Sequence, residues 1–180
     1  MRCTQKFSRC VRNNSIEQNR KGIMKEFIEE TKLFLSETEK KLRSISEFAS
    51  SVKPAPNKWS SKEILGHLVD SSINNLTRFV NGQYQADLVF PGYDQDKWVA
   101  LQNYQTAKWE FIIDMWKLNN AQLIRILELM PDQVRTKKHS LHNFDVIEWK
   151  GVPQSEPATL DYLIGDYYGH MKYHLDQILK

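Results

Sequence analysis

Residues 59–70 read WSSKEILGHLVD, a stretch that marks the start of a helix. Ser60 and Glu63 have the spacing of a capping box, in which each side chain accepts a hydrogen bond from the other residue's backbone N–H. Apolar residues then recur at helical spacing as far as Phe79, and Gly82 is a typical residue for a helix end. The stretch therefore predicts a helix from about residue 60 to about residue 81.

Three other segments have the same helical periodicity, and they cover about residues 24–50, 103–130 and 157–179. Prolines separate or bound them: Pro54, Pro56, Pro131 and Pro157. Four amphipathic helices of this length, without a strong strand pattern, predict an all-α four-helix bundle.

Two connections between these helices are long. Residues 83–102 contain the turn signal FPGYD at 90–94, and we expect a crossover connection there between helices two and three. Residues 131–156 are interpreted as irregular, although DVIEW at 145–149 has the composition of a short strand.

The composition is that of one globular domain. The chain has 180 residues, of which 41% are hydrophobic, and it contains no apolar run long enough to span a membrane. The net charge is +3, but residues 1–21 hold six Lys and Arg residues and one Glu. The remainder is therefore slightly acidic, which argues against nucleic acid as a partner.

The first 23 residues are expected to lie outside the domain. They contain both cysteines, Cys3 and Cys10, and precede the helical pattern that begins at Met24. We interpret residues 1–23 as a disordered or non-native extension and residues 24–180 as the folded domain. A domain without cysteine excludes a disulfide framework, a cysteine nucleophile and a cysteine-ligated zinc ion, and the default location is the cytoplasm.

The fourth helix carries a pair of histidines that can chelate a metal ion. His170 and His174 are four residues apart, so their imidazoles lie on the same helix face one turn apart. On its own this spacing is found more often in surface pairs than in ligand pairs.

His67 in the second helix is the candidate for a third ligand. Its neighbours at helical spacing are Ser71, Asn74 and Arg78, a polar seam on a helix that otherwise faces a core. The seam is either a solvated face or the wall of a polar cavity facing the fourth helix. In the second case three imidazoles would leave coordination positions open, as catalytic metal sites do.

Several of these segments together resemble the DinB-like superfamily over about residues 24–180. The resemblance rests on WSSKEILGHLVD with the later Arg78, on FPGYDQD at 90–96, and on GHMKYHLDQI at 169–178. It implies a four-helix bundle with a crossover connection, a homodimer, and one divalent metal ion (zinc, nickel or iron) bound by His67, His170 and His174. Relatives include transferases that use low-molecular-weight thiols, a mycothiol-dependent isomerase and proteins named as metal-dependent hydrolases.

Other polar residues are weaker candidates for the site. Asp166 and Glu63 each lie one turn before a proposed ligand, where a carboxylate acts as a general base, accepts a hydrogen bond from the ligand, or is simply solvated. Arg78 suits either a substrate carboxylate or a surface ion pair. His139 and His142 are three residues apart, but Lys137 and Lys138 repel a cation.

The residues support two functional hypotheses. The first is an enzyme for a small-molecule substrate, in which the metal ion activates water for hydrolysis or a low-molecular-weight thiol for transfer. The second is a metal-binding or structural helical bundle without catalytic turnover. Nucleic-acid binding through the basic N-terminal segment is a distant third.

Overall fold

The computed structural model describes the backbone of residues 2–180 and the side chains of residues 22–180. Four long helices form the bundle: α1 (Arg2–Arg43), α3 (Ser61–Asn81), α5 (Trp109–Leu129) and α8 (Leu160–Ile178). Shorter helices lie in the connections, and these are α2 (Glu47–Ser51), α4 (Gln95–Gln102), the 3₁₀ helix η1 (Tyr104–Thr106), α6 (Asp132–Arg135) and α7 (Phe144–Ile147). Residues 2–180 contain two isolated bridges, Leu88 with His142 and His139 with Ala158, but no strand.

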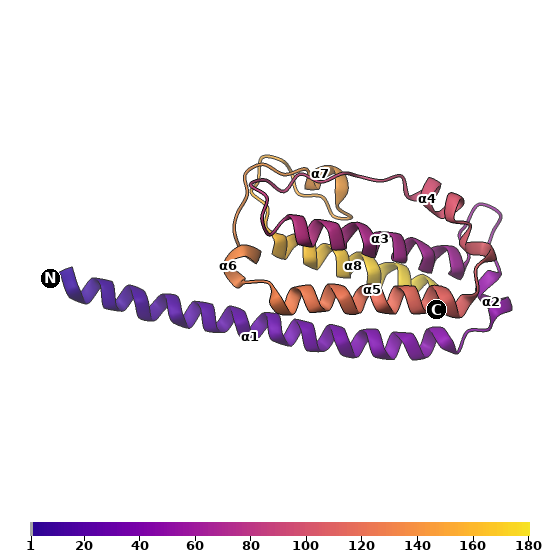
Figure 1. Cartoon of the computed structure of the whole chain (residues 1–180), viewed down its shortest axis with the longest axis horizontal. Coiled ribbons are helices and arrows are strands. Elements are labelled where there is room, and N and C mark those ends of the chain that lie inside the picture. The colour runs from indigo at the N-terminus through magenta and orange to yellow at the C-terminus, as the bar shows by residue number, and fades with distance from the viewer. Residues whose placement is uncertain (1) are drawn as a thin grey trace.

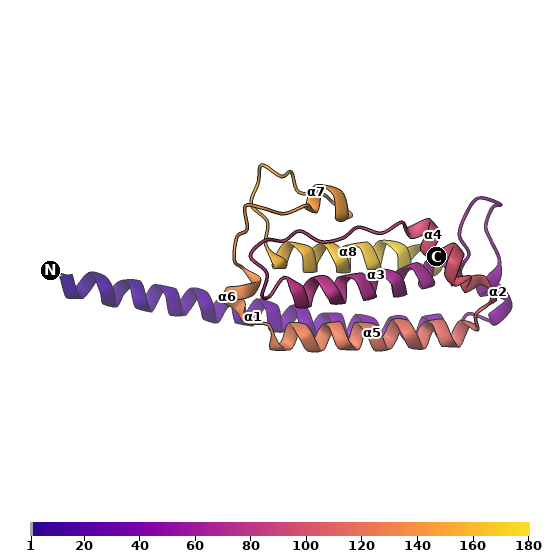
Figure 2. The ribbon, with the colours of Figure 1, turned by 45° about the horizontal axis from the view of Figure 1, so that its top comes forward.

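The crossover connection makes α3 and α5 run in the same direction. After α3 the chain returns along the whole length of the bundle to α4, and only then enters α5 (Figure 1). Helix α3 packs against both α5 and α8, and α1 packs against α5 (Figure 2). The predicted all-α four-helix bundle with a crossover is therefore confirmed, and α3 and α8 are neighbours.

The local signals at α3 act as the sequence predicts. The Ser60 side chain accepts from the Glu63 N–H, Glu63 accepts from the Ser60 N–H, and Gly82 forms the C-cap. Gly66 allows a close approach, because a Cβ atom at this position would overlap the ring of Tyr104. The Tyr104 hydroxyl donates to Asp70 over 2.7 Å, which attaches the end of the crossover to α3.

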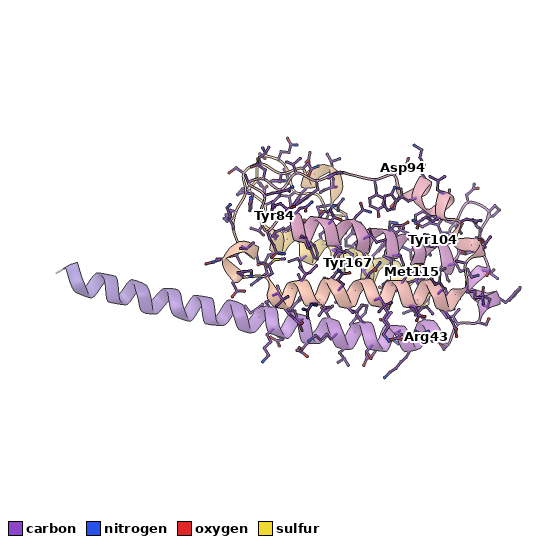
Figure 3. The ribbon with its side chains drawn as sticks, viewed as in Figure 1. Arg43, Tyr84, Asp94, Tyr104, Met115 and Tyr167 are labelled. Atoms are coloured by element: carbon purple, nitrogen blue, oxygen red, sulfur yellow. The ribbon has the colours of Figure 1, made fainter. Side chains whose placement is uncertain are left out.

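The core joins all four long helices. Trp109 and Trp116 of α5 are fully buried, and the Trp109 Nε1–H donates to the carbonyl of Leu42 at the end of α1. Tyr167 of α8 lies between α3 and α5 (Figure 3), where its ring meets Phe79 edge-on and its hydroxyl donates to Asn120.

Some boundaries differ from those expected. The first helix breaks at residues 44–46, since the Ser46 side chain caps α2 by accepting from the Ala49 N–H. The crossover contains α4, which Asp94 caps and Asn103 ends in a left-handed conformation. Residues 145–149 do not form a strand, because the chain makes a single helical turn at Phe144–Ile147.

Helix α1 begins at Arg2, so the backbone of residues 2–23 continues the helix expected from about residue 24. This first part extends beyond the ends of the other long helices (Figure 1). Whether residues 24–180 fold without it stays a prediction. Among the described helices, none is both long and apolar enough to cross a membrane.

Candidate metal centre

Three histidines from two helices meet between α3 and α8. The nitrogens that His67, His170 and His174 offer for coordination all lie within 4.8 Å of one another. The Nε2 atoms of His67 and His170 are 3.2 Å apart. Among the described side chains, this is the one cluster in which three His, Cys, Asp or Glu residues could share an ion.

The spacing of these nitrogens fits a tetrahedral metal ion. Imidazole nitrogens about 2.05 Å from zinc at tetrahedral angles lie about 3.3 Å apart, close to the distance between His67 and His170. The alternative, a hydrogen bond between two imidazoles, satisfies only two of the three rings. The three residues therefore suit a shared cation, with at least one coordination position left for another molecule.

Burial keeps these imidazoles in the neutral form that binds metal. Desolvation, followed by the charges of the other two histidines, lowers the pKa of His67 to about 3. Desolvation and His174 lower the pKa of His170 to about 4, and desolvation lowers that of His174. The triad thus carries no positive charge of its own at neutral pH, and a cation entering it displaces no proton.

A cavity of about 240 Å³ adjoins the triad and settles the nature of the polar seam on α3. Its wall includes His67 and His170 together with Ser71, Asn75 and Arg78. Ser71 and Arg78 of the predicted seam are buried in this wall, so this side of α3 faces a cavity and is not a solvated face. Asn74 is half-buried and lies outside the lining, and Asn75 lies there in its place. The burial of Arg78 also excludes a surface ion pair for this residue.

The loop after α7 forms the opposite wall of the cavity, and Asp166 of α8 holds it in place. The Asp166 carboxylate accepts from the backbone N–H groups of Trp149 and Lys150 over 2.8 and 2.9 Å. The Trp149 ring consequently lies over α8, with its centroid 6.3 Å from that of His170. In this structure Asp166 anchors the loop that closes the cavity, and its action as a general base is untested.

Glu148 is the cavity residue that sequence reasoning missed. Its side chain is only 2% exposed, and it lies 3.9 Å from Arg78. Burial, followed by a hydrogen bond with Asp166, raises the pKa of Glu148 to about 9. No local pattern distinguishes Glu148 from the many exposed carboxylates of the chain, since the fold of the loop alone brings it inward.

Glu63 lies outside the cavity lining. One carboxylate oxygen accepts from the Ser60 N–H in the capping box, and the other pairs with Lys53 over 2.8 Å. These contacts stabilise the start of α3, and no hydrogen bond joins the Glu63 carboxylate to the described side chains of the triad.

The remaining two histidines join loops. His139 Nδ1 donates to the carbonyl of Ala86 over 2.9 Å. His142 donates from Nε2 to the carbonyl of Glu156 and accepts at Nδ1 from the Phe144 N–H. Both rings are buried and use these nitrogens for hydrogen bonds, which explains why the pair lies outside the metal-binding cluster.

Comparison with known proteins gives one structural neighbour. No protein-family model and no curated protein sequence matches the chain. The structural neighbour is the solved structure of YfiT from Bacillus subtilis, which is described as a probable metal-dependent hydrolase with an unusual four-helix bundle topology. The two structures superpose with a TM-score of 0.67 over 86% of this chain and 83% of YfiT, at 19% sequence identity. The chain therefore shares the four-helix bundle fold of YfiT, as its sequence predicts.

Proposed function

We propose that this protein is a metal-dependent enzyme for a small-molecule substrate, with one divalent ion bound by His67, His170 and His174. The observation that carries the proposal is the convergence of three imidazole nitrogens within 4.8 Å beside a polar cavity. The description of YfiT as a probable metal-dependent hydrolase with the same fold supports it. Zinc, nickel and iron all bind imidazole, so the ligand set leaves the choice among them open.

The residues of the chain have distinct roles in this proposal. The three histidines would hold the ion, which would supply the charge that makes a water or thiol more acidic. The Trp59 ring, 5.2 Å from that of His67, shields one side of the triad from water. The loop held by Asp166 shields another side, so the reactive position is reached through the cavity.

Two reactions suit this site. With water as the nucleophile the reaction is hydrolysis, and with a thiol it is transfer of that thiol to an electrophile. The chain's two cysteines, Cys3 and Cys10, both precede the domain, so a low-molecular-weight thiol would have to come from solution. Hydrolysis is the first of the two to test, because it needs no second substrate besides water.

The deciding experiment has two stages. Protein purified without a histidine tag is analysed for metals, and we expect about one equivalent of zinc, nickel or iron. The metal-loaded protein is then screened against esters and amides, and against electrophiles together with cysteine or glutathione. Turnover that disappears on chelation and returns with the metal supports the enzyme. Bound metal without turnover in either screen would favour the second hypothesis, a metal-binding bundle without catalysis.

A homodimer and a cytoplasmic location remain part of the proposal. The resemblance to the DinB-like superfamily implies the homodimer, and the lack of cysteine in residues 24–180 makes the reducing cytoplasm the default location. Light scattering coupled to gel filtration measures the first, and fractionation of the producing cell measures the second.

A further inference from the structure

Arg78 is a buried cation with few partners. The residue is 6% exposed and lines the cavity beside the triad. Its one hydrogen bond joins Nη2 to the carbonyl of Pro91 over a long 3.4 Å, and its Nε–H has no partner. A guanidinium group has five N–H donors, and leaving several of them unpaired in a buried place is costly.

Another buried arginine shows how this protein satisfies such a group. Arg135 is 5% exposed, and its terminal nitrogens pair with the carboxylates of Asp132 and Asp161. No carboxylate lies within hydrogen-bonding distance of Arg78, because the nearest, Glu148, is 3.9 Å away. Both arginines have an unpartnered Nε, but only Arg78 lacks an anion at its terminal nitrogens and has an adjoining cavity.

Glu148 does not replace the missing anion. It shares a hydrogen bond with Asp166, and its raised pKa keeps it protonated at neutral pH. The Asp166 carboxylate is directed to the backbone N–H groups of Trp149 and Lys150, and not to Arg78. The guanidinium group of Arg78 therefore faces the cavity as a positive charge, and the carboxyl group closest to it is neutral.

Asn75 adds a hydrogen-bond acceptor to the same wall. It lies three residues before Arg78, so both side chains are on one face of α3. The residue is 6% exposed, its Nδ2 donates to the carbonyl of Ser71, and its Oδ1 has no partner. An unpaired acceptor beside an unpaired cation fits a ligand with a donor close to a negative charge.

We propose that the cavity binds a small carboxylic acid that carries an O–H or N–H donor next to its carboxylate, with Arg78 holding the carboxylate and Asn75 accepting from the donor. This inference rests on the proposed function only in taking the bound acid to be the substrate of the enzyme. The planar fork of Arg78 can pair in bidentate geometry with a carboxylate or with a phosphate. The Asp166 carboxylate on the same cavity wall favours the carboxylate, because it repels a doubly charged phosphate more strongly than a singly charged group.

The position of Arg78 also sets the direction of the ligand. His67 and Arg78 are eleven residues apart on α3, which corresponds to about 16 Å along the helix axis. A long side chain on a helix leans toward the N-terminal end, so Arg78 leans toward His67. The carboxylate end of the acid therefore lies at the far end of the cavity, and the reactive end points to the triad.

The test uses glycolate, the smallest probe with both groups, and the metal-free full-length protein. We expect glycolate to shift the NMR signals of the Arg78 Nε–H and the Asn75 side-chain amide in a saturable manner. Acetate lacks the donor and glycolamide lacks the charge, so each should bind more weakly. Absence of a saturable shift at either group in the parent protein overturns the proposal, as does equal or tighter binding of inorganic phosphate.

Variants separate the cavity from general charge effects. Arg78→Gln should weaken glycolate binding at least about tenfold, as followed at the Asn75 amide. Arg125→Gln makes the same change of charge at an exposed position on α5 and should bind as the parent does. Equal weakening by both variants would overturn the assignment to Arg78. Because no metal is present, a negative result leaves the triad untouched, and a protein that binds no metal can still bind glycolate.

Discussion

The Nε2 atoms of His67 and His170 lie 3.2 Å apart, although 103 residues separate these histidines in the chain. Helix α3 contributes one ring and α8 the other, so a shared cation would connect two helices that are distant in sequence. Such a cation would stabilise the fold as well as support chemistry, because it binds only when both helices are in place.

His67→Ala is expected to abolish tight metal binding and the rise in melting temperature that added metal gives the parent. The metal-free variant should still fold, since the apolar core does not depend on the imidazole. Isothermal titration with zinc and thermal unfolding with and without zinc measure the two effects. A variant that keeps the parent's affinity and stabilisation would show that His170 and His174 bind metal without α3.

Replacement of either α8 ligand should remove the metal, whereas replacement of the loop histidines should not. We expect His170→Ala and His174→Ala to lose most of the bound equivalent. His139→Ala and His142→Ala should retain it but lose about 1–3 kcal/mol of stability, because each removes a buried ring and its hydrogen bond to a loop carbonyl. Metal analysis and urea unfolding on the same samples distinguish the two classes. A full equivalent in both α8 variants would refute the site.

Gly66→Ala should destabilise the protein by about 1–3 kcal/mol, a typical cost of overpacking. The added methyl group would overlap the Tyr104 ring, which must move and give up its hydrogen bond to Asp70. Gly165→Ala on α8 is the matched control, since a Cβ there has no neighbour within 4 Å. Chemical unfolding measures both. Equal stability of the two variants would show that the approach of Tyr104 to α3 is not maintained in solution.

The stability of the protein should fall as pH rises from about 5 to 9, in part because of Glu148. Its pKa is raised from 4.5 to about 9 on folding, so over this range the folded state holds a proton that the unfolded state has released. Glu148→Gln removes this dependence and should gain at least about 1 kcal/mol relative to the parent between pH 6 and pH 9. Urea unfolding at several pH values tests this. Parallel profiles for variant and parent would mean that Glu148 is ionised in the folded protein.

Deletion of residues 1–21 should leave the fold and the metal content intact. Among the described side chains of α1, Met24 and Phe27 pack on the core, and the deletion retains both. Circular dichroism, melting temperature and metal analysis of the truncated protein test this expectation. A large loss of melting temperature would assign the segment to the domain.

The sequence by itself determined the helices and the fold class. The capping box at Ser60, the apolar periodicity and the prolines are local signals, and each acts through neighbours within a few residues. The spacing of His170 and His174 is local in the same sense, because a helix places residues four apart on one face. The crossover between α3 and α5 also follows from the chain, since the connection is long enough to return along the bundle.

Only the tertiary structure decided which side chains meet. From the sequence, the helix face that contains His67 and the polar seam could be either a solvated face or a cavity wall. Periodicity shows which residues share a helix face, but it does not show what that face contacts. Packing of α3 against α8 and the loop held by Asp166 made it a cavity wall. The same packing buried Arg78 without an anion and turned Glu148 inward. Contacts between residues far apart in the chain depend on the whole fold, and so no local pattern could indicate them.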